Sequence, residues 1–265
     1  MQQNVRMTRS EELWVAACIE AALPGVEVLV HDDGSSNAMY DLDLIRNGRL
    51  FAACEVTAAG DARSIELWNL LIGSNERWIE PNLDGGWLLE LDPRTRAKAL
   101  TRRAPDLLRR LEHNPEDQDP TTELKELGVT RAHKSATDFP GSIYVTLNRD
   151  ASLTGGFVAS TGDDILTWFE DWIRGEDQAH NLAKLGAAQY LAERHLFVLL
   201  PGFSSAPFSA TDLLMRDAAP LPTISPNLPD PLTHVWFMST WTSGAIFHGG
   251  PDGWSSYSKV FDLPR

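Results

Sequence analysis

The chain has 265 residues, of which 43% are hydrophobic and 23% are charged, and this composition excludes a disordered polymer. No apolar run approaches the roughly 18 residues that cross a bilayer, and the first residues lack the apolar core of a secretory signal. With only two cysteines, Cys18 and Cys54, we expect free thiols, a cytoplasmic location and no membrane partner. The net charge of −14 argues against tight, non-specific binding of nucleic acid, although a local basic face can act inside an acidic total.

The first 92 residues predict elements in the order α-β-β-β-α-β. A capping box formed by Thr8 and Glu11 begins the first helix, and Pro24-Gly25 ends it. The dipeptide Asn47-Gly48 is a strong hairpin signal. The expected elements are a helix over 10–23, strands over 26–30, 40–45 and 50–57, a helix over 61–72 and a strand over 86–91.

The rest of the sequence predicts further helices and strands from weaker patterns. A helix over 95–112 is expected to break near Ala104-Pro105, because proline cannot donate the helical hydrogen bond. Five prolines between Ala218 and Leu232 exclude a regular element there. The other expected elements are a loop over 113–122, helices over 163–174 and 177–194, and strands over 129–133, 142–147, 195–200, 235–238 and 245–248. We see no clean linker, so we expect one domain over 1–265, with residues 93–265 as an elaboration that completes the sheet.

Acidic residues interrupt the two strands of the predicted hairpin. Asp41 and Asp43 share one side of the first strand, and Glu55 lies in the second. Carboxylates in apolar strands are costly to bury unless a positive group pairs with them. A divalent cation is a suitable partner when two carboxylates converge, and Mg²⁺ takes one or two of them while keeping several waters.

The register of the hairpin decides whether Asp41 and Glu55 converge. A two-residue turn at Asn47-Gly48 pairs Asp41 with Cys54, and Glu55 then lies on the opposite side of the sheet. A three-residue loop pairs Asp41 with Ala53, so that Glu55 becomes its neighbour on the same face. A β-bulge could do the same. All three registers fit the sequence.

This arrangement resembles the core of the PD-(D/E)xK, or restriction-endonuclease-like, nuclease superfamily. Asp41 matches the family's Asp, and Glu55-Val56-Thr57 stands where the family has Glu-x-Lys. The resemblance covers residues 8–92, about a third of the chain. It implies an α/β fold with a mixed sheet, built on an α-β-β-β-α-β core and extended by C-terminal helices and strands.

The resemblance also implies roles for individual residues. Asp41, Glu55 and Glu12 (or Glu11) on the first helix would hold Mg²⁺ or Mn²⁺. Thr57 would occupy the position of the catalytic lysine, where it can orient a water but brings no positive charge. Arg63, at the start of the next helix, is a candidate for a cation that has moved.

Seven cations over 94–110 predict a basic helix after this core. Arg96, Arg103 and Arg110 recur at intervals of seven and could meet phosphates on one face. The alternative is a solvated helix whose cations pair with nearby acids. No G-x-S-x-G elbow, P-loop, G-x-G-x-x-G turn, H-E-x-x-H helix or C-x-x-C pair occurs.

The resulting hypothesis is a metal-dependent phosphodiesterase that acts on nucleic acid, with DNA as the favoured substrate. The missing lysine and the acidity favour an alternative, a catalytically inactive protein of the same fold that serves as a binding module for a nucleic acid or a protein. A third hypothesis, a mimic of DNA, rests on charge alone.

Overall fold

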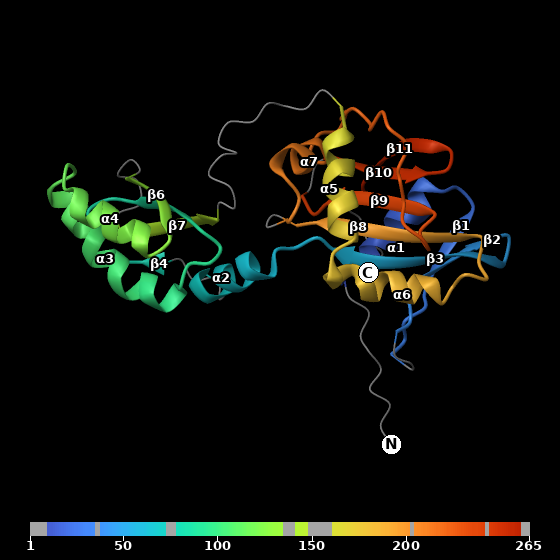
Figure 1. Cartoon of the computed structure of the whole chain (residues 1–265), viewed down its shortest axis with the longest axis horizontal. Coiled ribbons are helices and arrows are strands. Elements are labelled where there is room, and N and C mark those ends of the chain that lie inside the picture. Colours follow the sequence, from blue (N-terminus) through green and yellow to red (C-terminus); the bar gives the residue numbers. More distant parts are fainter. Residues whose placement is uncertain are drawn as a thin grey trace, which may run out of the picture. The chain divides into compact units, whose positions relative to one another are not determined.

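The computed structural model describes residues 10–34, 38–72, 78–134, 141–147, 161–201, 204–241 and 244–260. It divides the chain into two compact units, which we call unit 1 (Met1–Gly60 with Gly156–Arg265) and unit 2 (Asp61–Gly155) (Figure 1). This division differs from the single domain expected from the sequence. It also spreads the expected core, residues 8–92, over both units.

Unit 1 is built around a seven-stranded sheet in the order β1-β2-β3-β8-β9-β10-β11. The strands β3, β8 and β9 run parallel to one another, and the other neighbours are antiparallel, so the sheet is mixed. The elements of unit 1 are α1 (Ser10–Ala22), β1 (Val26–Val30), β2 (Leu42–Arg46), β3 (Arg49–Ala58), α5 (Asp163–Ile173), the 3-10 helix η2 (Glu176–Gln178), α6 (Ala179–Gly186), β8 (Glu193–Leu200), α7 (Phe208–Leu213), β9 (His234–Ser239), β10 (Ala245–Gly250) and β11 (Gly253–Ser258).

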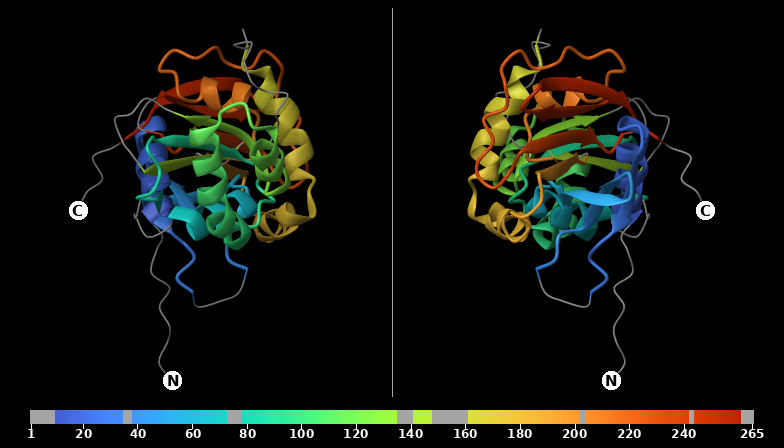
Figure 2. Two further views of the ribbon diagram at one scale, coloured as in Figure 1. Left: turned by 90° about the vertical axis from the view of Figure 1, so that its left-hand side faces the viewer. Right: turned by 90° about the vertical axis from the view of Figure 1, so that its right-hand side faces the viewer.

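Helices cover both faces of this sheet (Figure 2). One hydrophobic core joins α5 and α6 to alternate residues of the central strands, including Ala53, Val198 and Phe237. The residues between them face α1 and form a second core, as Cys54 and Phe197 do. This alternation follows from the period of two in a β-strand and gives the strands their nearly continuous apolar sequences.

Unit 2 has its own four-stranded sheet, in the order β4-β7-β5-β6. A third hydrophobic core, made only of unit 2 residues, lies between this sheet and its helices. The elements are α2 (Ala62–Ile72), β4 (Trp78–Ile79), β5 (Trp87–Leu91), α3 (Ala97–His113), α4 (Gln118–Glu126), β6 (Val129–Lys134) and β7 (Ser142–Leu147). The chain is thus a mixed α/β protein with a separate core in each unit.

The observed elements differ from those expected at several places, and β4, α7 and β11 were not expected at all. Helix α3 continues through Pro105, because its buried stripe, which includes Leu100 and Leu108, packs on the unit 2 sheet. The helix expected over 177–194 ends at Gly186, and β8 begins at Glu193. Residues expected to form a loop before 122 include the first turn of α4, whose N-cap is the Asp117 side chain. Thr8 of the expected capping box lies outside the described residues.

Two further findings concern expectations from composition. Both cysteines are buried free thiols. Among the described residues, no helix has both the length and the apolar character that crossing a bilayer requires.

Candidate functional site

A β-bulge in β3 sets the register of the hairpin. The tight turn has two residues, Asn47 and Gly48, both with positive φ (52° and 71°), and Arg46 pairs with Arg49. The register then shifts between Leu44 and Ile45, because β3 contains one extra residue there. Beyond the shift Leu42 pairs with Cys54, so the next pair along places Asp41 beside Glu55 on one face. The bulge therefore restores the convergence that a two-residue turn alone would prevent.

Asp41 and Glu55 are almost completely buried, at 3% and 2% exposure. The backbone N–H of Val56 donates to Asp41 Oδ2 at 2.7 Å, which fixes this carboxylate against β3. Lys184 Nζ on α6 donates to Glu55 Oε1 at 2.6 Å. The second oxygen, Glu55 Oε2, is buried and has no hydrogen-bond partner among the described atoms.

These carboxylates line a pocket of about 240 Å³ within unit 1. Glu12, at 4% exposure, enters it from the first turn of α1, and Thr57 enters it from β3. Helix α6 contributes three polar residues: His180, Asn181 and Lys184. All three residues expected to bind metal, Asp41, Glu55 and Glu12, therefore line one pocket.

The pKa of Glu55 is raised to about 8. Burial is the main cause, and the nearby negative charge of Asp41 adds to it, while Lys184 opposes the shift. A carboxyl group in this state holds its proton at neutral pH unless a further positive charge arrives. A cation beside Glu55 would favour the ionised form of this group.

The donors of this pocket suit a hard divalent cation. They are carboxylate oxygens, which Mg²⁺ and Mn²⁺ prefer, and the pocket has room for the waters that Mg²⁺ retains. The buried oxygen Glu55 Oε2 is the specific observation in favour of such a cation, because a buried carboxylate oxygen without a partner is costly. Glu55, with Asp41 and Glu12, would hold it.

The sequence analysis missed the three α6 residues of this pocket, of which Lys184 contacts Glu55 directly. Its helix and the following strand β8, which is parallel to β3, were treated as an elaboration. The available signal was a helix followed by the buried strand HLFVLL (195–200). This pair could complete the sheet as well as the segments 61–72 and 86–91 could. Arg63, the cation proposed instead, lies in α2 of unit 2, and its side chain is outside the described part.

Thr57 lies in the pocket but is held by a neighbour. Asn181 Nδ2 donates to Thr57 Oγ1 at 3.2 Å and to Gln178 Oε1 at 2.9 Å. Asn181 is 1% exposed, so this pair fixes α6 against β3. Asp43 belongs to a different network, in which it accepts from Tyr40 Oη at 2.8 Å and lies 3.2 Å from His31 Nδ1.

The three arginines expected to bind phosphate do not act alike. Arg103 and Arg110 both pair with Glu123 of α4, at 2.5 and 3.1 Å, and Arg110 also pairs with Asp117. Arg96 is exposed at the start of α3. The ion pairs hold α3 to α4, so only Arg96 of the three is left unpaired among the described residues.

A second cluster of possible metal ligands lies on β8 and β9, where Glu193, His195 and His234 bring their ligand atoms within 4.8 Å of one another. Trp236 Nε1, which can only donate, bonds to His195 Nδ1 at 2.9 Å. His195 Nε2 therefore carries the proton and donates it to Glu193 Oε2 at 2.9 Å. The rings of His195 and His234 are nearly parallel (13°) and stacked, and His195 Nε2 already donates to Glu193, so we describe this cluster as a hydrogen-bonded stack.

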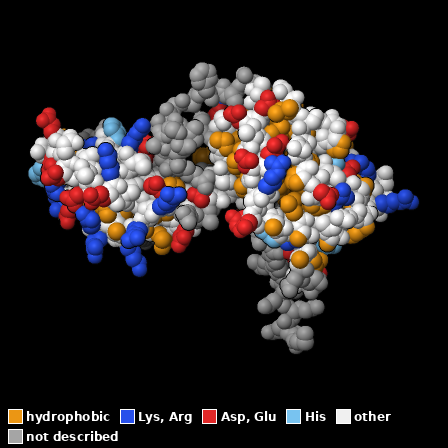
Figure 3. Space-filling view, in the orientation of Figure 1, with side chains coloured by type: hydrophobic (Ala, Val, Ile, Leu, Met, Phe, Trp, Pro, Cys, Tyr) orange, Lys and Arg blue, Asp and Glu red, His pale blue; other side chains and the backbone are white. Residues whose placement is uncertain are grey.

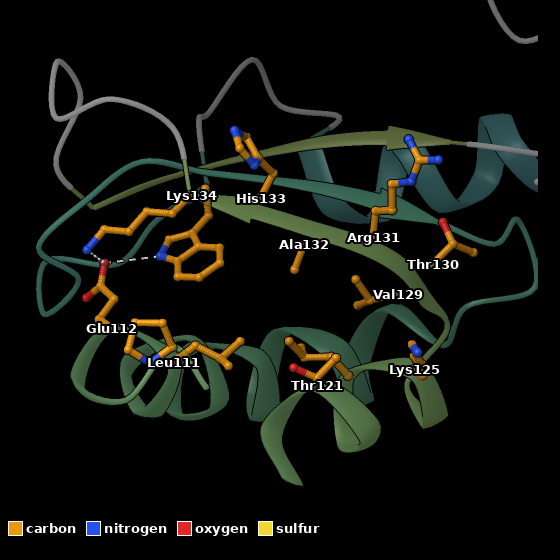
Figure 4. Close-up of a pocket in the computed structure, with 13 residues that line it drawn as sticks. Leu111, Glu112, Thr121, Lys125, Val129, Thr130, Arg131, Ala132, His133 and Lys134 are labelled. Carbon is orange, nitrogen blue, oxygen red and sulfur yellow. Dashed lines mark hydrogen bonds and ion pairs between the residues drawn. The ribbon is translucent and has the colours of Figure 1, made fainter. Parts of the chain in front are cut away.

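A hollow of about 420 Å³ in unit 2 lies between the helices and β6 (Figure 4). Its buried carboxylate, Glu112, accepts bonds from the backbone N–H groups of Asp84 and Gly85 and from Trp87 Nε1, and it pairs with Lys134. Its acceptors are thus used to tie α3 to the sheet. We assign no chemistry to this hollow.

Comparisons with protein-family models, with curated proteins and with solved structures found no match to this chain. The function must therefore be argued from the pocket of unit 1.

Proposed function

We propose that the protein is a metal-dependent phosphodiesterase that cleaves nucleic acid in the pocket of unit 1. One observation carries the proposal: three buried carboxylates and a lysine, from α1, β3, α6 and the residue before β2, line a single pocket. Three carboxylates with one amine are the groups needed to hold a divalent cation and to stabilise negative charge beside it.

The order of elements in unit 1 supports the same proposal. Helix α1 and the strands β1, β2 and β3 come first, and after helix α5 come helix α6 and the strand β8, which is parallel to β3. Apart from the extra helix α5, this is the α-β-β-β-α-β order of the PD-(D/E)xK core. In the sequence, unit 2 is inserted between β3 and α5. On this view the closing helix and strand are α6 and β8, rather than the segments over 61–72 and 86–91.

Lys184 supplies the positive charge that Thr57 lacks. Its amine comes from helix α6 and contacts Glu55, whereas the lysine of the family motif would stand on the strand, at the position of Thr57. This contact weakens one of the two arguments for an inactive protein, the absence of a lysine in the motif, and leaves the argument from acidity in place. We therefore retain catalysis as the proposal and inactivity as its rival.

The residues have separate tasks in this proposal. A bound Mg²⁺ would supply a Lewis acid and a water of lowered pKa. Glu12, Asp41 and Glu55 hold the cation, and the Val56 N–H keeps Asp41 oriented. Lys184 stabilises negative charge on the attacked phosphate, and Asn181 keeps α6 at the distance from β3 that this requires.

The direct test is cleavage of a panel of substrates, namely single-stranded DNA, duplex DNA and RNA, in Mg²⁺ and in Mn²⁺. We expect metal-dependent cleavage by the wild type and its loss in Asp41→Asn and in Glu55→Gln. Asp43→Asn is the matched control, because Asp43 lies two residues away and contacts Tyr40 and His31 outside the pocket. Equal cleavage by Asp41→Asn and wild type would contradict the proposal, and no cleavage of any substrate would favour the inactive alternative.

A further inference from the structure

Exposed cations form a continuous surface at the start of α3. Between residues 93 and 105 the chain has five Lys and Arg residues and no acidic residue. Lys and Arg side chains gather along the side of unit 2 on which α3 lies (Figure 3). We call the exposed set the α3 cationic surface; its members are Arg94, Arg96, Lys98, Arg102 and, from α4, Lys125.

The members of this surface lack carboxylate partners within the described part of the chain. Arg103 and Arg110 of the same helix differ from these residues, since both are held by Glu123. An exposed ion pair is already compensated, whereas an unpaired cation remains available to a phosphate. The surface that can meet an anion is therefore not the one expected from the spacing of seven.

The spacing on this surface suits a chain of phosphates. Lys98 and Arg102 are four residues apart in one helix and lie on one face, separated by about 6 Å along the axis. Arg94 precedes Lys98 by the same interval. Neighbouring phosphates in an extended nucleic-acid strand have a separation of the same order.

Two hollows adjoin the surface. One, of about 480 Å³, is lined by Arg94, Arg96 and Lys125, with Asp92 and Glu126 also present. The other, of about 350 Å³, is lined by Arg94 and Arg96 and by α2 residues that include Glu66 and Leu70. Arg94 and Arg96 thus line both hollows, which lie within unit 2.

The distribution of charge between the units favours the same partner. Unit 2 has 13 of the 23 Lys and Arg residues and 16 of the 37 Asp and Glu residues, although it makes up little more than a third of the chain. Unit 1, with the carboxylate pocket, therefore carries most of the net negative charge. A polyanion would meet strong repulsion over unit 1 and would need a cationic surface elsewhere.

We propose that the α3 cationic surface binds the phosphate backbone of the nucleic-acid substrate. The proposal rests on the proposed function for the identity of the substrate, but the binding itself needs neither the metal nor the pocket. Contacts of this kind position a nucleic acid and do not specify its sequence. Their affinity falls with salt, with a slope that counts the phosphates neutralised.

The test is fluorescence anisotropy of labelled single-stranded and duplex DNA and of RNA, measured with the full chain in EDTA over a range of salt concentrations. The variant Lys98→Gln with Arg102→Gln removes two unpaired cations from α3. We expect at least tenfold weaker binding and a slope of log K against log salt that is smaller by about 1.4 for single strands or 1.8 for duplexes.

The matched control is Arg103→Gln with Arg110→Gln, which removes two cations of the same helix that are already paired with Glu123. We expect the salt slope of this control to equal that of the wild type, with thermal unfolding showing that both variants are folded. Equal losses in the two variants, or no binding of any nucleic acid by the wild type, would overturn the inference. Binding of anionic vesicles in place of nucleic acid would overturn it as well.

The two proposals fail in different ways. A wild type that binds nucleic acid through Lys98 and Arg102 but never cleaves it would contradict the proposed function alone. A wild type that cleaves, with both double variants binding equally well, would contradict the α3 surface alone.

Discussion

Glu55 has two different environments at its two oxygens. Oε1 accepts a hydrogen bond from Lys184, whereas Oε2 is buried without a hydrogen-bond partner among the described atoms. Burial and Asp41 raise its pKa to about 8, so at neutral pH the group is largely protonated when no cation is bound. A divalent cation requires the ionised form. The proposed metal binding at this residue would therefore be coupled to the release of a proton.

This coupling predicts how metal affinity depends on pH. Below pH 8 the affinity for Mn²⁺ should rise by up to about tenfold for each unit of pH, because one proton must leave Glu55, and it should level off above pH 8. Calorimetric titrations in two buffers of different ionisation enthalpy, at pH 6.5 and pH 8, measure the protons released. An affinity that does not change over this range would show that Glu55 is already ionised or is no ligand.

Lys184 allows a second prediction. We expect Lys184→Met to reduce the rate of cleavage by about 10²–10³, as the loss of a group that stabilises transition-state charge does, and to leave metal binding intact. Restoring a lysine on the strand, by Thr57→Lys in the Lys184→Met background, should recover part of the rate. If Lys184→Met cleaves as fast as the wild type, the amine has no part in the reaction.

The sequence predicted the positions of the strands better than it predicted their pairing. The period of two and the Asn47-Gly48 turn located β1, β2 and β3 within a few residues. The extra residue of the bulge, Phe51, has no signal of its own in that pattern, because phenylalanine suits a regular strand as well as it suits a bulge. Asp41 and Glu55 could therefore be named from the sequence, whereas their contact could not.

Lys184 was missed because local pattern does not show which helix and strand share a core. The segments 61–72 and 86–91 have the same α-β pattern as α6 and β8, and they come first along the chain. Only the parallel pairing of β3 with β8, across more than a hundred residues, brings α6 to Glu55. Contacts between residues so far apart in the sequence are set by tertiary packing and cannot be predicted from local propensity.

The histidines of β8, β9 and β10 give a prediction for these elements. His195, His234 and His248 stack with ring centroids 4.3–5.9 Å apart, beside Glu193, and Tyr257 of β11 adjoins His248. Burial lowers the pKa of His234 to about 4 and that of His248 to about 3, and it lowers the pKa of His195 as well. Arg46 and Arg194 oppose protonation of the stack, and Glu193 and Asp252 favour it.

These folded-state pKa values lie below the unfolded value near 6.5, so the unfolded state binds more protons as the pH falls. The stability contributed by the neutral rings is present above pH 6.5 and is lost progressively from there towards pH 4. When the pH falls from 7.5 to 5, each ring that stays neutral should lower the free energy of unfolding by at most about 2 kcal/mol. Urea unfolding at both pH values measures the loss, which should shrink in His248→Phe and stay unchanged in the exposed control His113→Gln.

Because unit 1 and unit 2 share no hydrophobic core, we predict that unit 1 folds without unit 2. The two core clusters of unit 1 and the cluster of unit 2 have no residue in common. We expect replacement of residues 61–155 by a short Gly-Ser linker to give a folded protein that binds Mn²⁺ like the full chain but binds nucleic acid more weakly. Loss of cooperative unfolding in this variant would show that unit 1 depends on unit 2.

Calorimetric titration of Mn²⁺ at pH 8 tests whether Asp41 and Glu55 hold a divalent cation. We expect the wild type and Asp43→Asn to bind Mn²⁺, and Asp41→Asn combined with Glu55→Gln not to bind it, with all three proteins folded. No binding by the wild type, or equal binding by the double variant, would show that these carboxylates hold no cation.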